Sequence, residues 1–301
     1  MKRRDFLQQT AATGAFIGFG GLSLSFAPPS RKHITILHTN DVHSHIEPFG
    51  PNDPRNPNMG GIARRATLVE KIRNENPNTL LLDAGDIFQG TPFFNFYGGE
   101  LEFKLMSKLK YDAATIGNHD FDNGIDGLYA QLPHASFEFI SSNYGFKNTV
   151  MDGHTHPHKV FTKDGVKIGI FGLGVELKGL VNDHLYKETK YLDPIEIATD
   201  MVRILKQEKK CDLVICLSHL GYEYDSNKVS DVQLAKATQD IDLIIGGHTH
   251  TFLEKPTIAT NKAGKEVLIN QVGCFGLYLG RIDFYLDKDT AATAKGVQIS
   301  V

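Results

Sequence analysis

The sequence predicts an α/β fold in which short buried strands alternate with helices along the chain. Two observations indicate this class. Apolar runs of strand length recur between segments whose apolar residues are spaced for a helix, and no repeat of about 20–50 residues indicates a solenoid instead. The composition, 41% hydrophobic and 22% charged, is typical of a globular protein, and we find no shift in it that divides the chain into two domains.

The N-terminus predicts an export signal of the twin-arginine (Tat) type. Arg3 and Arg4 precede an aromatic-aliphatic pair, and a weakly apolar, glycine-rich stretch then ends at Ala27, where a small residue suits cleavage. A membrane-spanning helix needs about 20 strongly apolar residues, and this stretch is shorter, so we expect no stable membrane span. The mature chain is therefore expected to be periplasmic or otherwise extracytoplasmic. The predicted organisation is a Tat signal peptide over residues 1–27, a linker over residues 28–32 and one domain over residues 33–301.

The charge and the cysteine content exclude several classes of protein. A formal net charge of −3 provides no basic surface for nucleic acid, so we expect no nucleic-acid partner. The cysteines are Cys211, Cys216 and Cys274, and none belongs to a Cys-x-x-Cys pair. An odd number without metal-type spacing argues against a disulfide framework or a structural zinc site. We expect all three to be buried side chains.

The first half of the chain predicts strands separated by helices and irregular loops. Apolar residues at helical spacing share one face between Gly61 and Asn76, and Pro77 ends this helix. The segment from Glu47 to Met59 is rich in proline and asparagine and therefore predicts a loop. In order, we expect strands over residues 33–39, 80–82, 113–116 and 137–140, helices over 61–76 and 100–109, and loops over 47–59 and 88–97.

The second half begins with a predicted hairpin over residues 159–172. It turns at Asp164-Gly165, and Val166, Ile168 and Ile170 alternate on the returning strand. Helical spacing and apolar runs predict the rest of the chain in the same way. In order, we expect helices over residues 194–210 and 229–238, strands over 213–217 and 241–245, and two closing antiparallel strands over 267–270 and 279–286.

Polar side chains able to bind a metal follow five of these strands. Ligands of open α/β sheets collect at the carboxyl ends of the strands, so we expect these side chains to meet in one place. Imidazole, carboxylate and amide donors suit zinc, manganese, iron or cobalt rather than calcium, and there are too many for one tetrahedral ion. Each residue taken alone has a plainer interpretation, such as a turn residue or a helix cap, but their coincidence favours a dinuclear site. The residues are Asp41, His43, Asp86, Asn118, His119, His219, His248 and His250.

The motifs around these residues resemble the calcineurin-like metallophosphoesterase superfamily. Over about His33 to Leu286, the chain more closely resembles the catalytic domain of the 5′-nucleotidase/UDP-sugar hydrolase family. This resemblance implies a four-layer α/β/β/α sandwich of two mixed sheets flanked by helices, with the catalytic domain over residues 33–301. The motifs are Asp41-x-His43, Gly85-Asp86-x-x-x-Gly90, Gly117-Asn118-His119-Asp120, Phe121-Asp122, His219 and Gly247-His248-Thr249-His250.

The resemblance also implies a role for each site residue. Two divalent transition-metal ions (zinc, manganese, iron or cobalt) are expected, with Asp86 bridging them. His119 is expected to face the substrate phosphate, paired with Asp122, rather than to bind metal. Asp120 stands where relatives often carry Glu, a difference that we expect to be without consequence. One ion would be held by Asp41, His43, Asp86 and His250, and the other by Asp86, Asn118, His219 and His248.

The expected reaction is hydrolysis of a phosphate monoester, most closely that of a 5′-nucleotidase acting on nucleotides. Two cations about 3.5–4 Å apart would neutralise the phosphate oxygens and activate a water for in-line attack. His119 would stabilise or protonate the leaving group, and Asp122 would orient its ring. Alternatives are a cyclic-nucleotide phosphodiesterase, a sulfate-thiol esterase, or a non-catalytic metal-stabilised binding subunit.

Nucleotidases of the resembled family usually carry a second, C-terminal domain that binds the base. The sequence ends at Val301, just after the closing strands. Two outcomes are therefore open: a separate polypeptide supplies substrate recognition, which we favour, or the domain acts on another small phosphoester.

Three further features have plainer interpretations. His154, His156 and His158 fall in a predicted loop, and we expect them to be solvated. His45 extends the Asp41-x-His43 motif, but we expect it to lie in the surrounding loop rather than bind metal. The aromatic run over residues 93–97 suggests a base-stacking surface, yet core or interface packing is the expected role.

Overall fold

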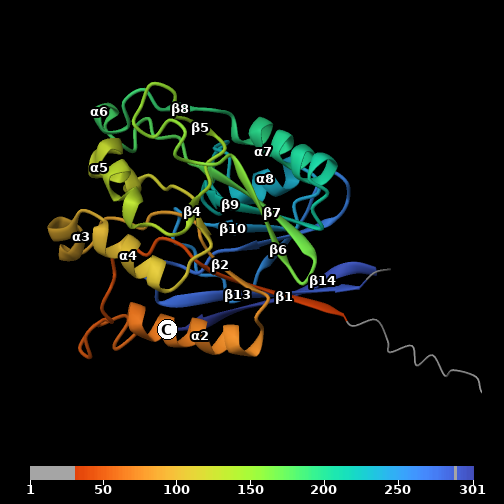
Figure 1. Ribbon diagram of the computed structural model, residues 1–301, viewed down its shortest axis with the longest axis horizontal. Helices are drawn as coiled ribbons and strands as arrows, with labels where there is room; N and C mark the ends of the chain where they lie inside the picture. Colours follow the sequence, from red (N-terminus) through yellow and green to blue (C-terminus); the bar gives the residue numbers. More distant parts are fainter. Residues whose placement is uncertain (1–30, 288–289) are drawn as a thin grey trace, which may run out of the picture.

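Two mixed β-sheets pack face to face, and helices cover the outer face of each (Figure 1). The computed structural model describes residues 31–287 and 290–301. The predicted signal peptide, residues 1–27, and residues 28–30 of the predicted linker lie outside this range. Within it, the predicted α/β class and the four-layer sandwich are confirmed.

The first sheet carries the N-terminal strands in parallel order, with two antiparallel strands from the C-terminus at one edge. The order is β14-β13-β1-β2-β3-β4. The neighbours β1/β2, β2/β3 and β3/β4 are parallel, whereas β13 is antiparallel to both β1 and β14. The strands are β1 (Lys32–Thr39), β2 (Thr79–Asp83), β3 (Ala113–Ala114), β4 (Glu138–Phe139), β13 (Tyr278–Asp287) and β14 (Thr290–Ser300).

The second sheet has the order β11-β12-β10-β9-β7-β6. Its central strands β7, β9, β10 and β12 are parallel, and β6 and β11 pair antiparallel at its two edges. The strands are β6 (His158–Lys163), β7 (Val166–Gly174), β9 (Leu213–His219), β10 (Leu243–Gly246), β11 (Thr257–Thr260) and β12 (Glu266–Asn270). Strands β5 (Tyr144–Gly145) and β8 (Lys190–Tyr191) pair as a separate two-stranded antiparallel sheet.

The strands are apolar on both faces because each sheet is covered on both sides. Ile34 and Ile36 of β1 face the second sheet, where Ile215 and Leu217 of β9 belong to the same buried cluster. Leu37, the residue after Ile36, belongs instead to the buried cluster under the helices that cover the first sheet. This packing fixes the two sheets against each other, so their carboxyl edges can share a site.

Helices form the two outer layers (Figure 1). The helices α2, α4 and α5 bury apolar residues against the first sheet, and α7 and α8 do so against the second. Asp193 caps α7 by accepting the N–H groups of Ile195 and Glu196. The helices are α2 (Ile62–Glu75), α3 (Pro92–Tyr97), α4 (Glu100–Lys108), α5 (Gly124–Gln131), α6 (Asp183–Tyr186), α7 (Pro194–Arg203) and α8 (Asp231–Ala237).

Several element predictions need correction. The predicted loop over residues 88–97 contains helix α3, which starts at Pro92 with the proline in its first turn. The predicted helix over residues 194–210 is α-helical only to Arg203 and continues as one wide π turn over Ile204–Glu208. The predicted closing strand over residues 267–270 is antiparallel to β11 but parallel to β10. The hairpin at Asp164-Gly165 and the antiparallel β13 are confirmed.

The cysteine prediction is confirmed, since Cys211, Cys216 and Cys274 are buried and form no disulfide. For the aromatic run over residues 93–97, the sequence predicts packing in the core or at an interface: Phe94 packs against the core, whereas Phe96 is 83% exposed, so for Phe96 only the interface alternative stays open. In the part of the chain that the structure describes, no helix combines the length and apolar character needed to cross a membrane.

A buried polar pair joins the two sheets. Nε2 of His38 in β1 lies 2.8 Å from Nδ2 of Asn270 in β12, and the ring accepts this hydrogen bond in its neutral form. Burial lowers the pKa of His38 from 6.5 to about 3. The unfolded chain therefore takes up a proton as the pH falls below 6.5, whereas the folded chain stays neutral.

This pair predicts a specific loss of stability in acid. Between its unfolded pKa of 6.5 and its folded pKa of about 3, His38 lowers the free energy of unfolding as the pH falls, by up to about 1.4 kcal/mol per pH unit. A His38→Gln variant lacks this contribution and should lose stability less steeply in urea titrations between about pH 6.5 and pH 4.5. The exposed His154→Gln variant should keep the wild-type slope, and equal slopes in all three proteins would contradict the prediction.

Candidate metal centre

Two clusters of metal-binding side chains lie where the carboxyl ends of the two sheets meet. Asp41, His43 and His250 form the first cluster, and Asp86, His219 and His248 form the second. In each cluster the potential ligand atoms lie within 4.8 Å of one another. The first sheet supplies Asp41 and His43 after β1 and Asp86 after β2, while the second sheet supplies His219 at the end of β9 and His248 and His250 after β10.

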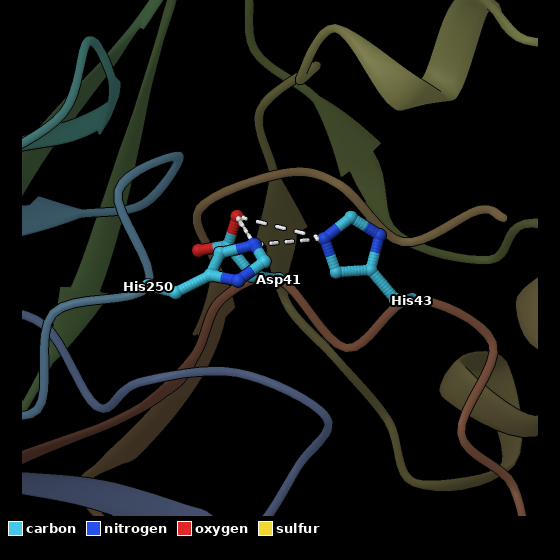
Figure 2. Close-up of side chains that lie close together, drawn as sticks. All are labelled: Asp41, His43 and His250. Carbon is cyan, nitrogen blue, oxygen red and sulfur yellow. Dashed lines mark hydrogen bonds and ion pairs between the residues drawn. The ribbon is translucent and has the colours of Figure 1, made fainter. Parts of the chain in front are cut away.

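The first cluster brings one carboxylate and two imidazoles together, and Figure 2 shows both rings directed toward the carboxylate. Nε2 of His250 lies 3.4 Å from Oδ1 of Asp41, and Nε2 of His43 lies 4.0 Å from the same oxygen. The two Nε2 atoms are 3.0 Å apart. A carboxylate oxygen and two ring nitrogens around one point match the donors that borderline divalent ions take.

The second cluster adds an amide to the same kind of donor set. Nε2 of His219 lies 3.0 Å from Oδ2 of Asp86. Nδ1 of His248 lies 2.8 Å from Oδ1 of Asn118, so the amide that the sequence predicts as a ligand lies beside this cluster. Nε2 of His219 is fully buried and faces carboxylate oxygens of both Asp86 and Asp41, the latter at 3.9 Å. A buried ring nitrogen that faces carboxylate oxygens is suited to a metal.

Asp86 lies between the two clusters. Its Oδ2 is 3.0 Å from Nε2 of His219 in its own cluster and 3.8 Å from Nε2 of His43 in the other. Its Oδ1 accepts the N–H of His119 at 2.8 Å. The position of this carboxylate is therefore compatible with the predicted bridge between two ions.

Two motif glycines are needed for this close approach. A Cβ on Gly117 would lie 2.2 Å from Oδ1 of Asp86, and one on Gly247 would lie 2.8 Å from Nδ1 of His219. Any larger residue would displace a candidate ligand. The glycines of these motifs thus have a physical role in bringing strands from both sheets to one point.

Most of the candidate ligands adopt a left-handed backbone. The φ angle is 51° at Asp41, 49° at His43, 55° at Asp86, 77° at His248 and 52° at His250. This conformation costs a non-glycine residue about 1–2 kcal/mol. It persists only where the surrounding contacts hold it, and such residues concentrate at functional sites.

Two buried side chains hold these loops, and sequence reasoning gave neither of them this role. Asp120 accepts the N–H groups of Asp86, Ile87, Phe88 and Gly117, at 2.8–3.1 Å. It thereby ties the loop that carries Asp86 to the loop that carries Asn118.

Asn40 connects the two sheets in a comparable way. Its Nδ2 donates to Oδ2 of Asp41 at 2.6 Å and to the carbonyl of Gly273 at 2.7 Å, and its Oδ1 accepts the N–H of Val272 at 3.0 Å. Since these contacts are to the backbone or to an adjacent residue, no spacing in the sequence indicates them. Of the two residues, only Asp120 belongs to a motif named above, Gly117-Asn118-His119-Asp120.

His119 and Asp122 form a pair beside the clusters, outside both ligand sets. Nδ1 of His119 lies 2.8 Å from Oδ2 of Asp122, and the His119 side chain is 39% exposed. Its ring centroid is 5.2 Å from that of His43. The hydrogen bond to Asp122 raises the pKa of His119. An exposed imidazole held by a carboxylate next to a cation site can donate a proton to a bound molecule.

The surroundings of the cluster histidines shift their pKa values in opposite directions. The hydrogen bond to Asp41 raises the pKa of His250 to about 10. Burial opposes protonation of His219, but Asp86 raises its pKa to about 10. Burial lowers the pKa of His248 to about 3. Since an imidazole binds metal in its neutral form, metal binding would displace protons from His219 and His250.

The sequence pattern of the calcineurin-like phosphoesterase family matches residues 34–252, which include every residue of both clusters. The chain belongs to this family. Membership confirms the predicted resemblance and the prediction of a metal-dependent ester hydrolase. The two clusters, within a phosphoesterase fold, imply divalent metal ions.

Several relatives of this calcineurin-like phosphoesterase are named as 5′-nucleotidases or as a nucleotide phosphoesterase. It is 33% identical to snake venom 5′-nucleotidase from Crotalus adamanteus, over 84% of this chain and 45% of that one. It is 30% identical to the trifunctional nucleotide phosphoesterase protein YfkN of Bacillus subtilis, over 94% of this chain and 21% of that one. The solved 5′-nucleotidase precursor from Thermus thermophilus superposes with a TM-score of 0.82 and 32% identity, over 90% of this chain and 55% of that one. The chain thus spans about half the length, or less, of these relatives.

The remaining predicted features lie outside the clusters. Nδ1 of His45 donates to the carbonyl of His43 at 2.9 Å, and its ring packs on Phe275. His156 pairs with Glu138 at 3.0 Å on the surface, and His158 is the first residue of β6 rather than part of a loop. His154 is exposed and packs its ring against Tyr129.

Proposed function

We propose that this calcineurin-like phosphoesterase is an exported dinuclear metalloenzyme that hydrolyses phosphate monoesters, with nucleoside 5′-monophosphates as its substrate class. The observation that carries the proposal is the convergence of six side chains able to bind metal, three in each of two adjacent clusters, beside a partly exposed His–Asp pair. Two cation sites next to a proton donor suit attack on a doubly charged ester.

We assign each predicted ligand to the ion of the cluster in which, or beside which, it lies. Asp41, His43, Asp86 and His250 would hold one ion. Asp86, Asn118, His219 and His248 would hold the other, with Asp86 shared. When bound, two divalent ions supply charge neutralisation of the phosphate oxygens and a water of lowered pKa. Zinc, manganese, iron and cobalt all suit these donors.

The protein's own groups complete the reaction. His119 would face the phosphate with its Nε2, because Nδ1 is held by Asp122 at 2.8 Å. The raised pKa keeps a proton available on the ring for the leaving alkoxide. Asp122 would fix the ring's orientation and stabilise its charged form.

Nucleotides are proposed as substrates because the relatives from Crotalus adamanteus and Thermus thermophilus are named 5′-nucleotidases. We further propose that a separate polypeptide supplies recognition of the base. Support comes from helix α3, where Phe96 and Tyr97 are 83% and 52% exposed. The helix follows Thr91, which donates a hydrogen bond to the carbonyl of Ser44, next to His43. These exposed aromatic side chains offer such a partner an apolar contact surface close to the site.

Export by the Tat route is the proposal that fits the N-terminal sequence. The twin arginines Arg3 and Arg4 support the route, and the venom origin of one relative supports export. Loss of export in an Arg3→Lys/Arg4→Lys double variant, measured by cell fractionation, would be the expected result.

The substrate assay tests the proposed activity. The mature chain is loaded with zinc or manganese and assayed with nucleoside monophosphates, an aryl phosphate, a phosphodiester, a cyclic nucleotide and a sulfate ester, with and without co-purifying proteins. Monoester hydrolysis, with nucleotide hydrolysis increased by a co-purifying protein, is expected. Preference for the cyclic nucleotide over the monoesters would favour a cyclic-nucleotide phosphodiesterase instead. Full nucleotidase activity of the isolated chain would contradict the separate partner, and bound metal without hydrolysis of any ester would contradict an enzyme.

A further inference from the structure

Gln271 is a fully buried residue that contacts neither cluster directly but holds the segment between them. Its Nε2 donates to the carbonyl of Gly247 at 2.8 Å. Its Oε1 accepts the hydroxyl of Thr249 at 3.1 Å and the N–H of Thr251. One side-chain amide therefore spans the segment that carries His248 and His250, and bonds both of its ends.

The bonded segment is the one that separates the two histidines into different clusters. His248 lies in the cluster of Asp86, and His250 in that of Asp41, although only one residue stands between them. Both have left-handed backbone, with φ of 77° and 52°. A free segment of this sequence would prefer other conformations, so an external contact must select this one.

Only a side chain with a donor and an acceptor at this length can make these contacts. The carbonyl of Gly247 requires a donor, and the N–H of Thr251 requires an acceptor. Gln271 follows β12 directly, and its own carbonyl accepts the N–H of Leu253 at 3.1 Å. Its backbone is thus anchored at the end of β12 and by this hydrogen bond to Leu253.

We propose that Gln271 is a positioning residue that pre-forms the His248–His250 segment and thereby sets the affinity of both clusters for metal. The proposal rests on the metal assignment made above. Residues that orient metal ligands typically contribute about 10–100-fold to metal affinity. Gln271 differs from such residues in acting on the backbone between two ligands, so one substitution should weaken both sites.

The test compares two full-length variants with the wild type. Gln271→Met keeps the volume and removes every hydrogen bond, and Asn261→Leu is the matched control. Asn261 is a buried amide that holds the β11–β12 turn through the N–H groups of Ala263 and Lys265, at 2.9 and 3.0 Å, without contact to a ligand. Zinc affinity of the metal-free proteins is measured by competition with a chromophoric chelator, together with the melting temperature.

Gln271→Met is expected to bind zinc about 10–100-fold more weakly at both sites, while Asn261→Leu binds like the wild type despite a lowered melting temperature. Wild-type zinc affinity in Gln271→Met would overturn the proposal. Hydrogen exchange at the Thr251 amide gives a second readout: slow exchange in the metal-free wild type supports a pre-formed segment, and exchange at the rate of an unprotected amide overturns it. If the wild type itself fails to bind zinc, the proposed function is contradicted. The exchange rate at the Thr251 amide then still shows whether the segment that Gln271 bonds is pre-formed.

Discussion

An Asp86→Ala variant is expected to lose metal from both clusters and to lose phosphoester hydrolysis by about 10³-fold or more, since several kcal/mol of charge stabilisation disappear at about 1.4 kcal/mol per factor of ten. Asp86 lies between the clusters, with its Oδ2 at 3.0 Å from Nε2 of His219 and 3.8 Å from Nε2 of His43. Oδ1 of Asp41 also lies 3.9 Å from Nε2 of His219, but its shortest approach, 3.4 Å, is to His250 of its own cluster. We therefore expect Asp41→Ala to affect mainly the first ion and Asp86→Ala to affect both. Metal content by mass spectrometry and the rate with a nucleoside monophosphate are the measurements.

The matched control is Asp126→Ala, which removes an exposed carboxylate that pairs only with Lys187 among the ion pairs of the described residues. This variant should keep both ions and the wild-type rate. If Asp86→Ala retained one ion at full occupancy, the carboxylate would not be a bridge, and the two clusters would be independent sites.

A His119→Ala variant is expected to keep both ions but to lose about 10²–10⁴-fold in turnover, the usual contribution of a general acid. Its ring lies outside both clusters and is held at Nδ1 by Asp122. The loss should be larger for a nucleotide, whose alkoxide leaves poorly, than for an aryl phosphate, whose leaving group needs no proton. Asp122→Asn should show the same pattern to a smaller degree, because it changes the hydrogen bond that orients the ring.

Removing the exposed His154 provides the control for His119, since both variants delete one imidazole from the surface. His154→Ala should match the wild type with every substrate. Wild-type turnover of nucleotides by His119→Ala would remove this residue from the reaction, and loss of metal from it would show that the ring acts as a ligand.

Much of the fold follows from the sequence because its central strands are buried on both faces. Continuous apolar runs such as Leu80–Leu82 and Leu213–Leu217 are visible without any structure, and both became strands. The ligands follow for a related reason: each stands directly after such a run, and parallel strands bring their carboxyl ends together. Family motifs then added the pairing of His119 with Asp122, which spacing alone does not indicate.

Other parts of the fold could not be predicted for physical reasons. The direction of β12 depends on its neighbours, because a short apolar run fits a parallel or an antiparallel position equally well. Helix α5 contains Gly124 and Gly127, and β5 and β8 are two residues long, so local preference gives no clear signal for any of them. The division of the strands between two sheets likewise depends on packing across the interior.

The roles of Asn40, Asp120 and Gln271 escaped prediction because they act on backbone groups of distant segments. Asp120 was expected to tolerate exchange with Glu without consequence, yet its carboxylate accepts four backbone N–H groups. A longer side chain must move these loops or its own backbone to keep those bonds. Motif spacing identifies the candidate ligands, whereas the groups that orient them emerge only from the folded chain.

The number of ions that activity requires tests the central claim most directly. The metal-free mature chain is titrated with zinc or manganese while ions bound per chain and the rate of phosphate release are followed together. The dinuclear site predicts two ions per chain, no hydrolysis without metal, and recovery of the rate only as the second ion binds. Full activity with one ion per chain, or no ester hydrolysis with two ions bound, would contradict it.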